Sequence, residues 1–86
     1  MTLPTIHSNG TSQEALIDAL CDASSAIDKA YAALKKTAPN GRDYYPQGAP
    51  AMDKAVAEHN NRMKRLDAIK AEIDELTIKI DEGGAQ

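Results

Sequence analysis

The sequence predicts an all-α fold, in which an antiparallel two-helix hairpin with an extended N-terminal arm assembles with copies of itself into a helical-bundle homo-oligomer. Two long segments repeat apolar residues at spacings of three and four, and a segment with two Pro and two Gly separates them. No segment alternates apolar and polar residues as a half-buried strand does. We therefore expect a single domain with an arm over residues 1–10, a helix over 11–38, an ordered loop over 39–49, a helix over 50–82 and a tail over 83–86.

Turn and capping residues mark the arm and the start of the first helix. Pro4 fixes its own φ and favours an extended arm, and Asn9-Gly10 is a strong turn dipeptide. Thr11 and Glu14 have the spacing of a capping box, in which each side chain bonds to the backbone N–H of the other residue. We expect Thr11 to be the N-cap of the first helix.

A heptad seam follows in the first helix. Its apolar residues alternate spacings of four and three, and the small residues among them let another helix approach closely. The seam consists of Leu16, Leu20, Ala23, Ile27, Ala30 and Leu34. Pro39 directly follows Ala38, so we expect the helix to end near Ala38.

The second helix begins with a Pro and carries a longer apolar stripe. Pro50 suits the first helical turn, where its missing N–H is not needed, and Gly83-Gly84 provides a C-terminal stop. The stripe consists of Met52, Val56, His59, Met63, Leu66, Ile69, Ile73, Leu76 and Ile80. Further apolar residues flank the two stripes, namely Ile17, Tyr31, Ala55, Ala68 and Ile78.

The composition indicates that the hairpin needs partner chains. The 86 residues are 42% hydrophobic but only 3% aromatic, and one Cys with two His provides neither an internal disulfide nor a zinc site. A single core in a chain this short rarely contributes more than about 3–5 kcal/mol. We expect copies of the hairpin to associate as a dimeric four-helix bundle or a larger ring. The residues expected in the core or the oligomer interface are Leu16, Leu20, Ile27, Leu34, His59, Met63, Leu66 and Ile73.

Several classes of function are disfavoured by what the sequence lacks. No apolar run approaches the roughly 18–20 residues of a membrane span, so we expect no membrane partner, and the single Cys21 fits a cytoplasmic protein. The net charge of −3 argues against nucleic acid as a partner. No phosphate-binding loop, nucleophile elbow or zinc-protease motif is present. We therefore expect no enzyme, no cofactor and no metal site.

The charges separate along the predicted hairpin. Residues 35–65, at the loop end, hold seven Lys and Arg side chains against three acidic ones, a net charge of +4. The rest of the chain holds three Lys side chains against ten acidic ones, a net charge of −7. Such a division is typical of solvated surfaces that pair with antiparallel neighbours, and it also suits an anion site at the loop end.

The residue types at the positive end favour a nucleotide site. Arg42 offers a planar fork for a phosphate, and Tyr44 and Tyr45 offer flat faces on which a base can stack. Gln47 can contact a base edge, and Arg62 on the second helix supplies a further cation. These five are the candidate ligand-binding residues. Because Tyr and Arg also make the hot spots of protein interfaces, a protein interface is the close rival, and a nucleic-acid site ranks last.

Three segments carry a resemblance to a group of known proteins: TIHSNGTS at 5–12, APNGRDYYPQG at 38–48 and EHNNR at 58–62. Together they resemble small bacteriophage and prophage proteins of unassigned function. The resemblance implies a phage origin and action in the host bacterial cytosol, and it transfers no site residues. We therefore expect a non-enzymatic counter-defence protein that binds and sequesters a nucleotide-type immune signal. The alternative is a phage protein–protein interaction module, either an inhibitor of a host or defence protein or a minor virion or assembly protein.

Overall fold

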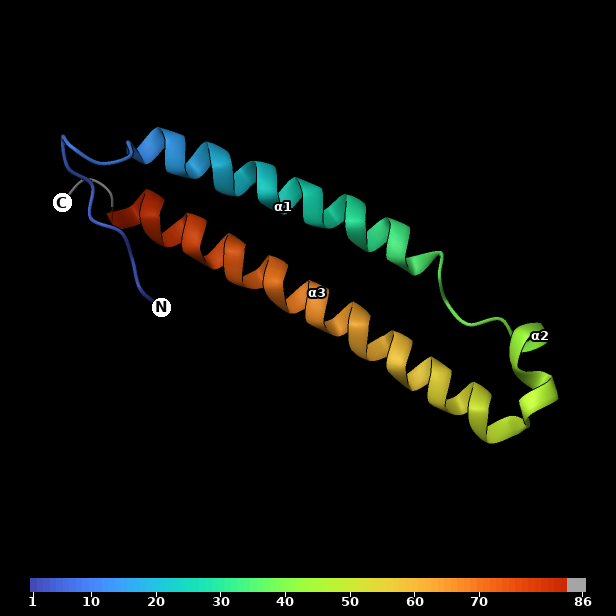
Figure 1. Cartoon of the computed structure of the whole chain (residues 1–86). Coiled ribbons are helices and arrows are strands. Elements are labelled where there is room, and N and C mark those ends of the chain that lie inside the picture. Colours follow the sequence, from blue (N-terminus) through green and yellow to red (C-terminus); the bar gives the residue numbers. More distant parts are fainter. Residues whose placement is uncertain (84–86) are drawn as a thin grey trace.

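The computed structural model describes residues 1–83 and shows two long antiparallel helices, as the sequence predicts. The elements are α1 (Gln13–Lys35), α2 (Gly41–Tyr44), the 3₁₀ helix η1 (Tyr45–Gln47) and α3 (Ala49–Gly83). Figure 1 shows α1 and α3 side by side, with α2 at one end and the N-terminal arm at the other. The hairpin is a rod of 62 × 20 × 18 Å, and the described residues contain no strand. The predicted tail beyond Gly83, with Gly84 of the expected stop, lies outside the described residues.

The first helix is shorter than predicted at both ends. Ser12, and not Thr11, is the N-cap, and its hydroxyl accepts a hydrogen bond from the N–H of Ala15 at 3.1 Å. The prediction of Thr11 was wrong because the backbone stays extended through Ser12, with φ −67° and ψ 154°. At the other end Lys36 is the C-cap, and the N–H of Thr37 bonds to the carbonyl of Leu34 at 2.9 Å. This tight last turn ends α1 before the predicted Ala38.

The predicted loop over 39–49 is largely helical. The Asn40 side chain caps α2 by accepting from the N–H of Arg42 at 2.9 Å, and η1 follows α2 without a break. Gly48 then adopts a φ of 93°, a left-handed conformation that glycine takes without strain, and α3 begins at Ala49. The chain therefore turns from α1 into α3 through a short folded segment.

The core between α1 and α3 is thin. Among residues 1–83, only Ala55, His59 and Ile80 are buried, at 8%, 7% and 5% exposure. The other residues expected in the core are half-buried, namely Leu16, Leu20, Ile27, Leu34, Met63, Leu66 and Ile73. The chain exposes 6417 Å², against about 4,900 Å² for a folded monomer of this mass. One interface between two helices cannot enclose a core on all sides.

Some residues of the predicted stripes lie outside this interface. Val56 and Ile69 on α3 are exposed, and so is Ala30 on α1. The prediction that these residues belong to the seam was wrong because two helices bury a narrow stripe, whereas the sequence pattern is wider. Ala55, predicted as a flanking residue, lies in the buried stripe instead.

The N-terminal arm packs against the last turns of α3. The turn at its end is closed by the N–H of Gly10, which bonds to the carbonyl of His7 at 3.1 Å, as the Asn9-Gly10 dipeptide predicts. A hollow of about 410 Å³ is lined by the arm and by α3, with Leu3, Pro4, Thr5, Ile6, Lys79, Ile80 and Gly83 around it. Gln13 also closes this end, because its side-chain amide donates to the carbonyls of Ile80 and Asp81 at 3.1 and 3.3 Å. Gln13 thus joins the start of α1 to the last turn of α3.

The buried end of the seam gives a direct test of the packing. Replacing Ile80 by Ala should lower the free energy of unfolding by about 2–3 kcal/mol, because the change removes buried methylene groups and leaves a cavity. Urea unfolding followed by circular dichroism measures it. Ile78→Ala is the matched control, since Ile78 on the same helix is 56% exposed and its loss should change stability by under about 0.5 kcal/mol. Equal losses in the two variants would show that the seam is placed wrongly.

Candidate functional site

Four of the five predicted ligand-binding residues lie together at the loop end of the hairpin, which we call the tip (residues 40–48). Arg42 lies on α2 and is exposed, and Tyr44 ends α2 and is half-buried. Tyr45 and Gln47 lie on η1, and the Tyr45 side chain is 78% exposed. The tip therefore presents Arg42, Asp43, Tyr45 and the amides of Asn40 and Gln47 to solvent, so its one cation lies next to a carboxylate in sequence and its formal charges cancel.

The tip is held by local hydrogen bonds and by contact with α3. Asn40 accepts from Arg42 as described, and the N–H of Asp43 bonds to the Asn40 carbonyl at 3.0 Å. The N–H of Gly48 bonds to the Tyr45 carbonyl at 3.1 Å, and both α2 and η1 contact α3. Arg42 and Tyr45 are thus three residues apart in continuous helical backbone, a spacing that brings side chains to neighbouring positions.

The fifth predicted residue, Arg62, is separated from the tip. It lies thirteen residues into α3 from Ala49, or about 20 Å along the helix axis. A shallow depression of about 340 Å³ contains it and is lined by α3 residues alone, namely Ala57, Glu58, Asn61, Arg62 and Arg65. Arg62 and Arg42 of one chain therefore do not form one phosphate site.

Two further findings concern the described residues 1–83 as a whole. No group of three or more His, Cys, Asp and Glu side chains in this range is placed to hold a metal ion. No helix in the same range combines the length and the hydropathy needed to cross a membrane.

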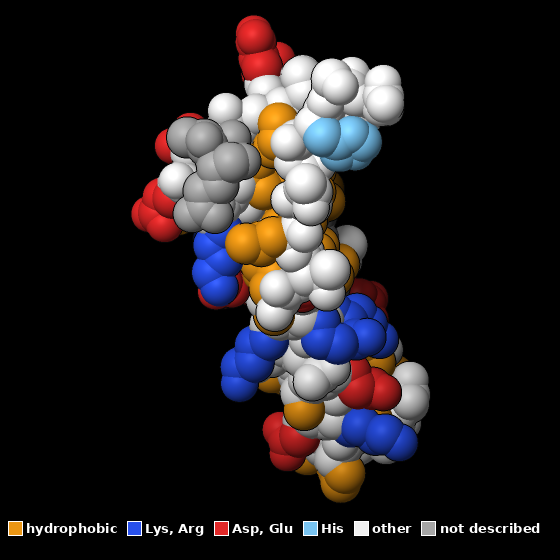
Figure 2. Space-filling view, turned by 90° about the vertical axis from the view of Figure 1, so that its left-hand side faces the viewer, with side chains coloured by type: hydrophobic (Ala, Val, Ile, Leu, Met, Phe, Trp, Pro, Cys, Tyr) orange, Lys and Arg blue, Asp and Glu red, His pale blue; other side chains and the backbone are white. Residues whose placement is uncertain are grey.

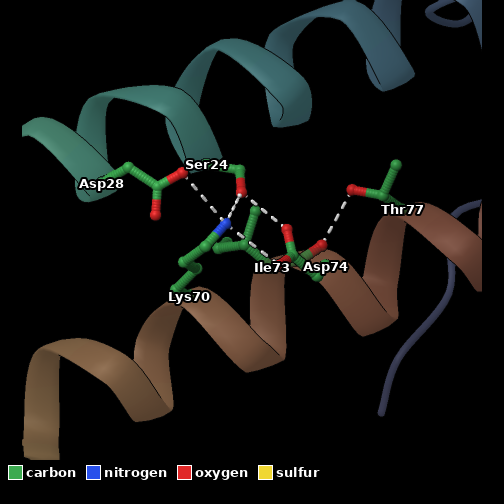
Figure 3. A network of polar contacts seen from close by, with 6 residues as sticks. All are labelled: Ser24, Asp28, Lys70, Ile73, Asp74 and Thr77. Carbon is green, nitrogen blue, oxygen red and sulfur yellow. Dashed lines mark hydrogen bonds and ion pairs between the residues drawn. The ribbon is translucent and has the colours of Figure 1, made fainter.

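The most connected polar group lies between α1 and α3, where sequence reasoning placed none. Figure 3 shows the side chains of Ser24 and Asp28 on α1 facing Lys70 and Asp74 on α3. The Ser24 hydroxyl donates to Asp74 at 2.6 Å and accepts from the Lys70 ammonium at 2.7 Å. Lys70 also pairs with Asp74 at 3.2 Å and with Asp28 at 3.5 Å. We call these four residues the interhelix network.

The network holds its two central groups in their charged forms. The hydrogen bond with Asp74 raises the pKa of Lys70 above its ordinary value, and the nearby charge of Asp28 adds to this. The hydrogen bond from Ser24 lowers the pKa of Asp74, and the bond from Lys70 adds to it. A Ser–Lys pair works as nucleophile and base only when the amine is neutral. Since Lys70 is held protonated, the network suits structural pairing of the helices rather than catalysis.

One feature of the sequence could have indicated the network, although it was not used. Lys70 and Asp74 are four residues apart, the spacing of an ion pair on one helix face, and both follow apolar positions of the α3 stripe. Ser24 directly follows Ala23 of the α1 seam, at the same kind of flanking position. The register between the two helices, which brings Ser24 to Lys70, could not be read from either helix alone.

The network predicts a specific pH dependence of stability. Folding lowers the pKa of Asp74. The charged carboxylate therefore adds to the free energy of unfolding above the unfolded-state pKa, and this contribution is lost as pH falls through the folded-state pKa. Asp74→Asn should therefore lower the melting temperature at neutral pH, and its difference from the wild type should vanish in strong acid. Because the pKa of Lys70 is raised, the contribution of Lys70 is complete below its ordinary pKa of 10.5 and is lost at higher pH.

Thermal unfolding between pH 2 and 11 measures both the loss of stability in acid and the loss at high pH. The control is Asp67→Asn, which removes the same charge from an exposed position of α3 outside the network. The two variants should differ at neutral pH. If Asp67→Asn and Asp74→Asn follow the same curve, the network does not contribute as described.

Comparison with known proteins adds no family to this geometry. No family model, no curated protein and no solved structure matches the chain. The tip, the interhelix network and the surfaces of the hairpin are therefore the features from which a function is inferred.

Proposed function

We propose that this protein is a non-enzymatic phage counter-defence protein that binds and sequesters a nucleotide-type immune signal through the tip of its hairpin. The observation that carries the proposal is the pair of exposed side chains Arg42 and Tyr45, three residues apart on an ordered helical turn. A guanidinium and a ring at this spacing can hold a phosphate and stack a base of one ligand. The resemblance to small phage proteins supplies the setting, which is the host bacterial cytosol.

The fixed backbone of the tip supports binding of a small ligand. The bonds around Asn40 and Gly48 and the half-buried Tyr44 hold the backbone of Arg42 and Tyr45 in place before the ligand arrives. A preorganised site loses less conformational entropy on binding than a mobile loop. The length of the connection is explained in this way, because a plain helix–helix turn needs fewer residues.

The charge distribution supports an anionic ligand. Residues 35–65 carry the net charge of +4, whereas the opposite end of the rod is acidic. Figure 2 shows Lys and Arg side chains in the middle and lower parts of the view with some acidic side chains beside them, and further acidic side chains at the upper edge. A phosphorylated ligand is attracted toward the tip and repelled from the other end.

Protein binding is the second candidate, and the exposure of Tyr45 favours it. The Tyr45 ring is 78% exposed. It does not line the hollow beside the arm, the hollow beside the interhelix network or the depression around Arg62. A flat, exposed Tyr next to an Arg is a typical anchor of a protein interface. In this case the hairpin inhibits a host or defence protein, or has a minor role in the virion or its assembly.

Calorimetry against a panel of cyclic and linear nucleotides tests the first candidate. We expect Arg42→Ala to weaken the affinity for the bound nucleotide about 10- to 100-fold, since a charge-assisted hydrogen bond contributes about 1.5–3 kcal/mol. Lys64→Ala is the matched control, because it removes one exposed cation from the same positive region outside the tip. Ligand released from the denatured complex should be chemically unchanged. The absence of heat for every nucleotide, or equal losses in both variants, would exclude nucleotide binding at the tip.

Affinity capture with Tyr45→Ala tests the second candidate. If the tip binds a protein, a partner of defined stoichiometry is retained by the wild type, and its affinity for purified Tyr45→Ala should fall at least about tenfold. Tyr31→Ala is the control, because it truncates the same side chain on α1, away from the tip. A partner retained equally by all three proteins binds elsewhere and rejects the tip as its interface.

A further inference from the structure

The seam between α1 and α3 divides the surface of the rod into two long faces. One face contains the interhelix network, in which Ser24 meets Lys70. Ile69 precedes Lys70 and lies on the other side of the α3 seam, since successive helical residues are about 100° apart. We call that side the Ile69 face. Its apolar residues by helical repeat are Leu16, Ala19, Ala23, Ala26, Ala30, Ile69 and Leu76, and the same repeat on α3 also places Arg62, Arg65 and Glu72 there.

The two faces differ in how readily another chain can cover them. On the network face, a partner would lie over Lys70 and its two carboxylate neighbours and would remove them from water. Such desolvation is unfavourable unless the partner replaces the lost hydration. On the Ile69 face the Ile69 side chain is 50% exposed and α1 presents mainly Ala, while Arg62, Arg65 and Glu72 on α3 carry its charges. Burial of Ile69 and of the Ala side chains against another helix is favourable, and the long Arg and Glu side chains can keep their charged ends in water.

The amount of exposed surface fits one further chain. The rod exposes about 1,500 Å² more than a typical monomer of its mass. A standard protein interface covers about 800 Å² of each partner. A single long contact along the rod accounts for about half of the excess, and the small Ala side chains let a second hairpin approach closely.

The charge distribution selects the orientation. With two copies side by side in the same direction, both segments of net charge +4 would lie together, and so would both acidic ends. With the copies antiparallel, residues 35–65 of each copy, with their net charge of +4, lie toward the acidic end of the neighbour. The antiparallel arrangement replaces two repulsions with two attractions along a rod of 62 Å.

We propose that a second copy of this chain covers the Ile69 face, antiparallel and related by a two-fold axis perpendicular to the rod. In this dimer α1 packs on α1 and α3 on α3, so that four helices enclose one core. Ile69 lies near the middle of α3, and the two-fold axis brings both copies of this residue toward each other. The arm and the acidic end of α3 of one copy lie beside the tip of the other, and their charge lowers the attraction of that tip for an anionic ligand. The inference concerns a surface other than the tip, so the dimer and the proposed function can fail separately.

Sedimentation velocity of matched variants tests the face. Ile69→Glu should weaken dimerisation at least about 100-fold, because it buries two carboxylates close together across the axis. Ile78→Glu is the matched control, since Ile78 is 56% exposed on the same helix and lies about two and a half turns away, on the opposite side. It should leave the dimer intact. Circular dichroism checks that both variants keep their helices. A monomeric wild type, or an assembly that Ile69→Glu leaves unchanged, overturns the proposal.

A distance measurement tests the orientation without altering the Ile69 face. Spin labels at Gln47→Cys, in a Cys21→Ser background, should lie at a distance close to the 62 Å length of the rod in the antiparallel dimer. In a parallel dimer they would lie within the combined width of two rods of about 20 Å each. Raising the salt from about 0.05 to about 0.5 M should weaken the antiparallel dimer, because screening removes the attractions between unlike ends. A short label distance, or a dimer that tightens with salt, contradicts the orientation.

Discussion

The constraint that shapes this protein is that two helices share only one interface. Each helix of the hairpin buries a narrow stripe against the other, and in the described part of the chain only Ala55, His59 and Ile80 are buried. Every other stabilising feature of the rod compensates for this thin core. The arm covers the last turns of α3, the tip folds against the first turns, and polar bonds join the helices in between.

The interhelix network has a role that apolar packing alone cannot have in such a thin core. Apolar side chains of similar size tolerate a slide of one helix along the other, whereas Ser24 reaches Lys70 and Asp74 in one register only. Gln13 fixes the same register from the end of the rod, because it donates to the carbonyls of Ile80 and Asp81 on α3. Two sets of polar contacts, about 15 Å apart along the helices, thus specify how the helices align.

The features that the sequence predicted well are those determined within one segment. The apolar spacing identified both long helices, and Asn9-Gly10 identified the turn of the arm. Features that depend on competition between neighbouring groups were missed. Thr11 and Ser12 both offer a hydroxyl, and only the extended backbone decides that Ser12 caps α1. The helical path of the tip was missed in the same way, because Pro46 and Gly48 suggested a loop although Asn40 can start a helix.

The candidate site shows the same division more sharply. The sequence placed Arg42, Tyr44, Tyr45 and Gln47 on one short segment, and they lie together on the tip. Arg62 was predicted as a second cation on the second helix, three residues after His59, but the path of α3 takes it away from the tip. Distance along a helix grows by about 1.5 Å per residue, so even a short separation in sequence can exceed the size of a nucleotide. A second cation for a ligand at the tip must therefore come from the tip's own surroundings or from another chain.

The exposure of the tip connects its chemistry with the assembly of the rod. Arg42 and Tyr45 on a surface open to water give weak binding, because the phosphate and the base each keep part of their hydration. In the proposed antiparallel dimer the neighbour of the tip is the acidic end of the second copy, which excludes water from the tip but also repels an anionic ligand. Assembly along the Ile69 face would therefore compete with ligand binding at the tip. In the same proposed dimer four helices enclose one core, so the thin core of the single hairpin becomes part of a larger one.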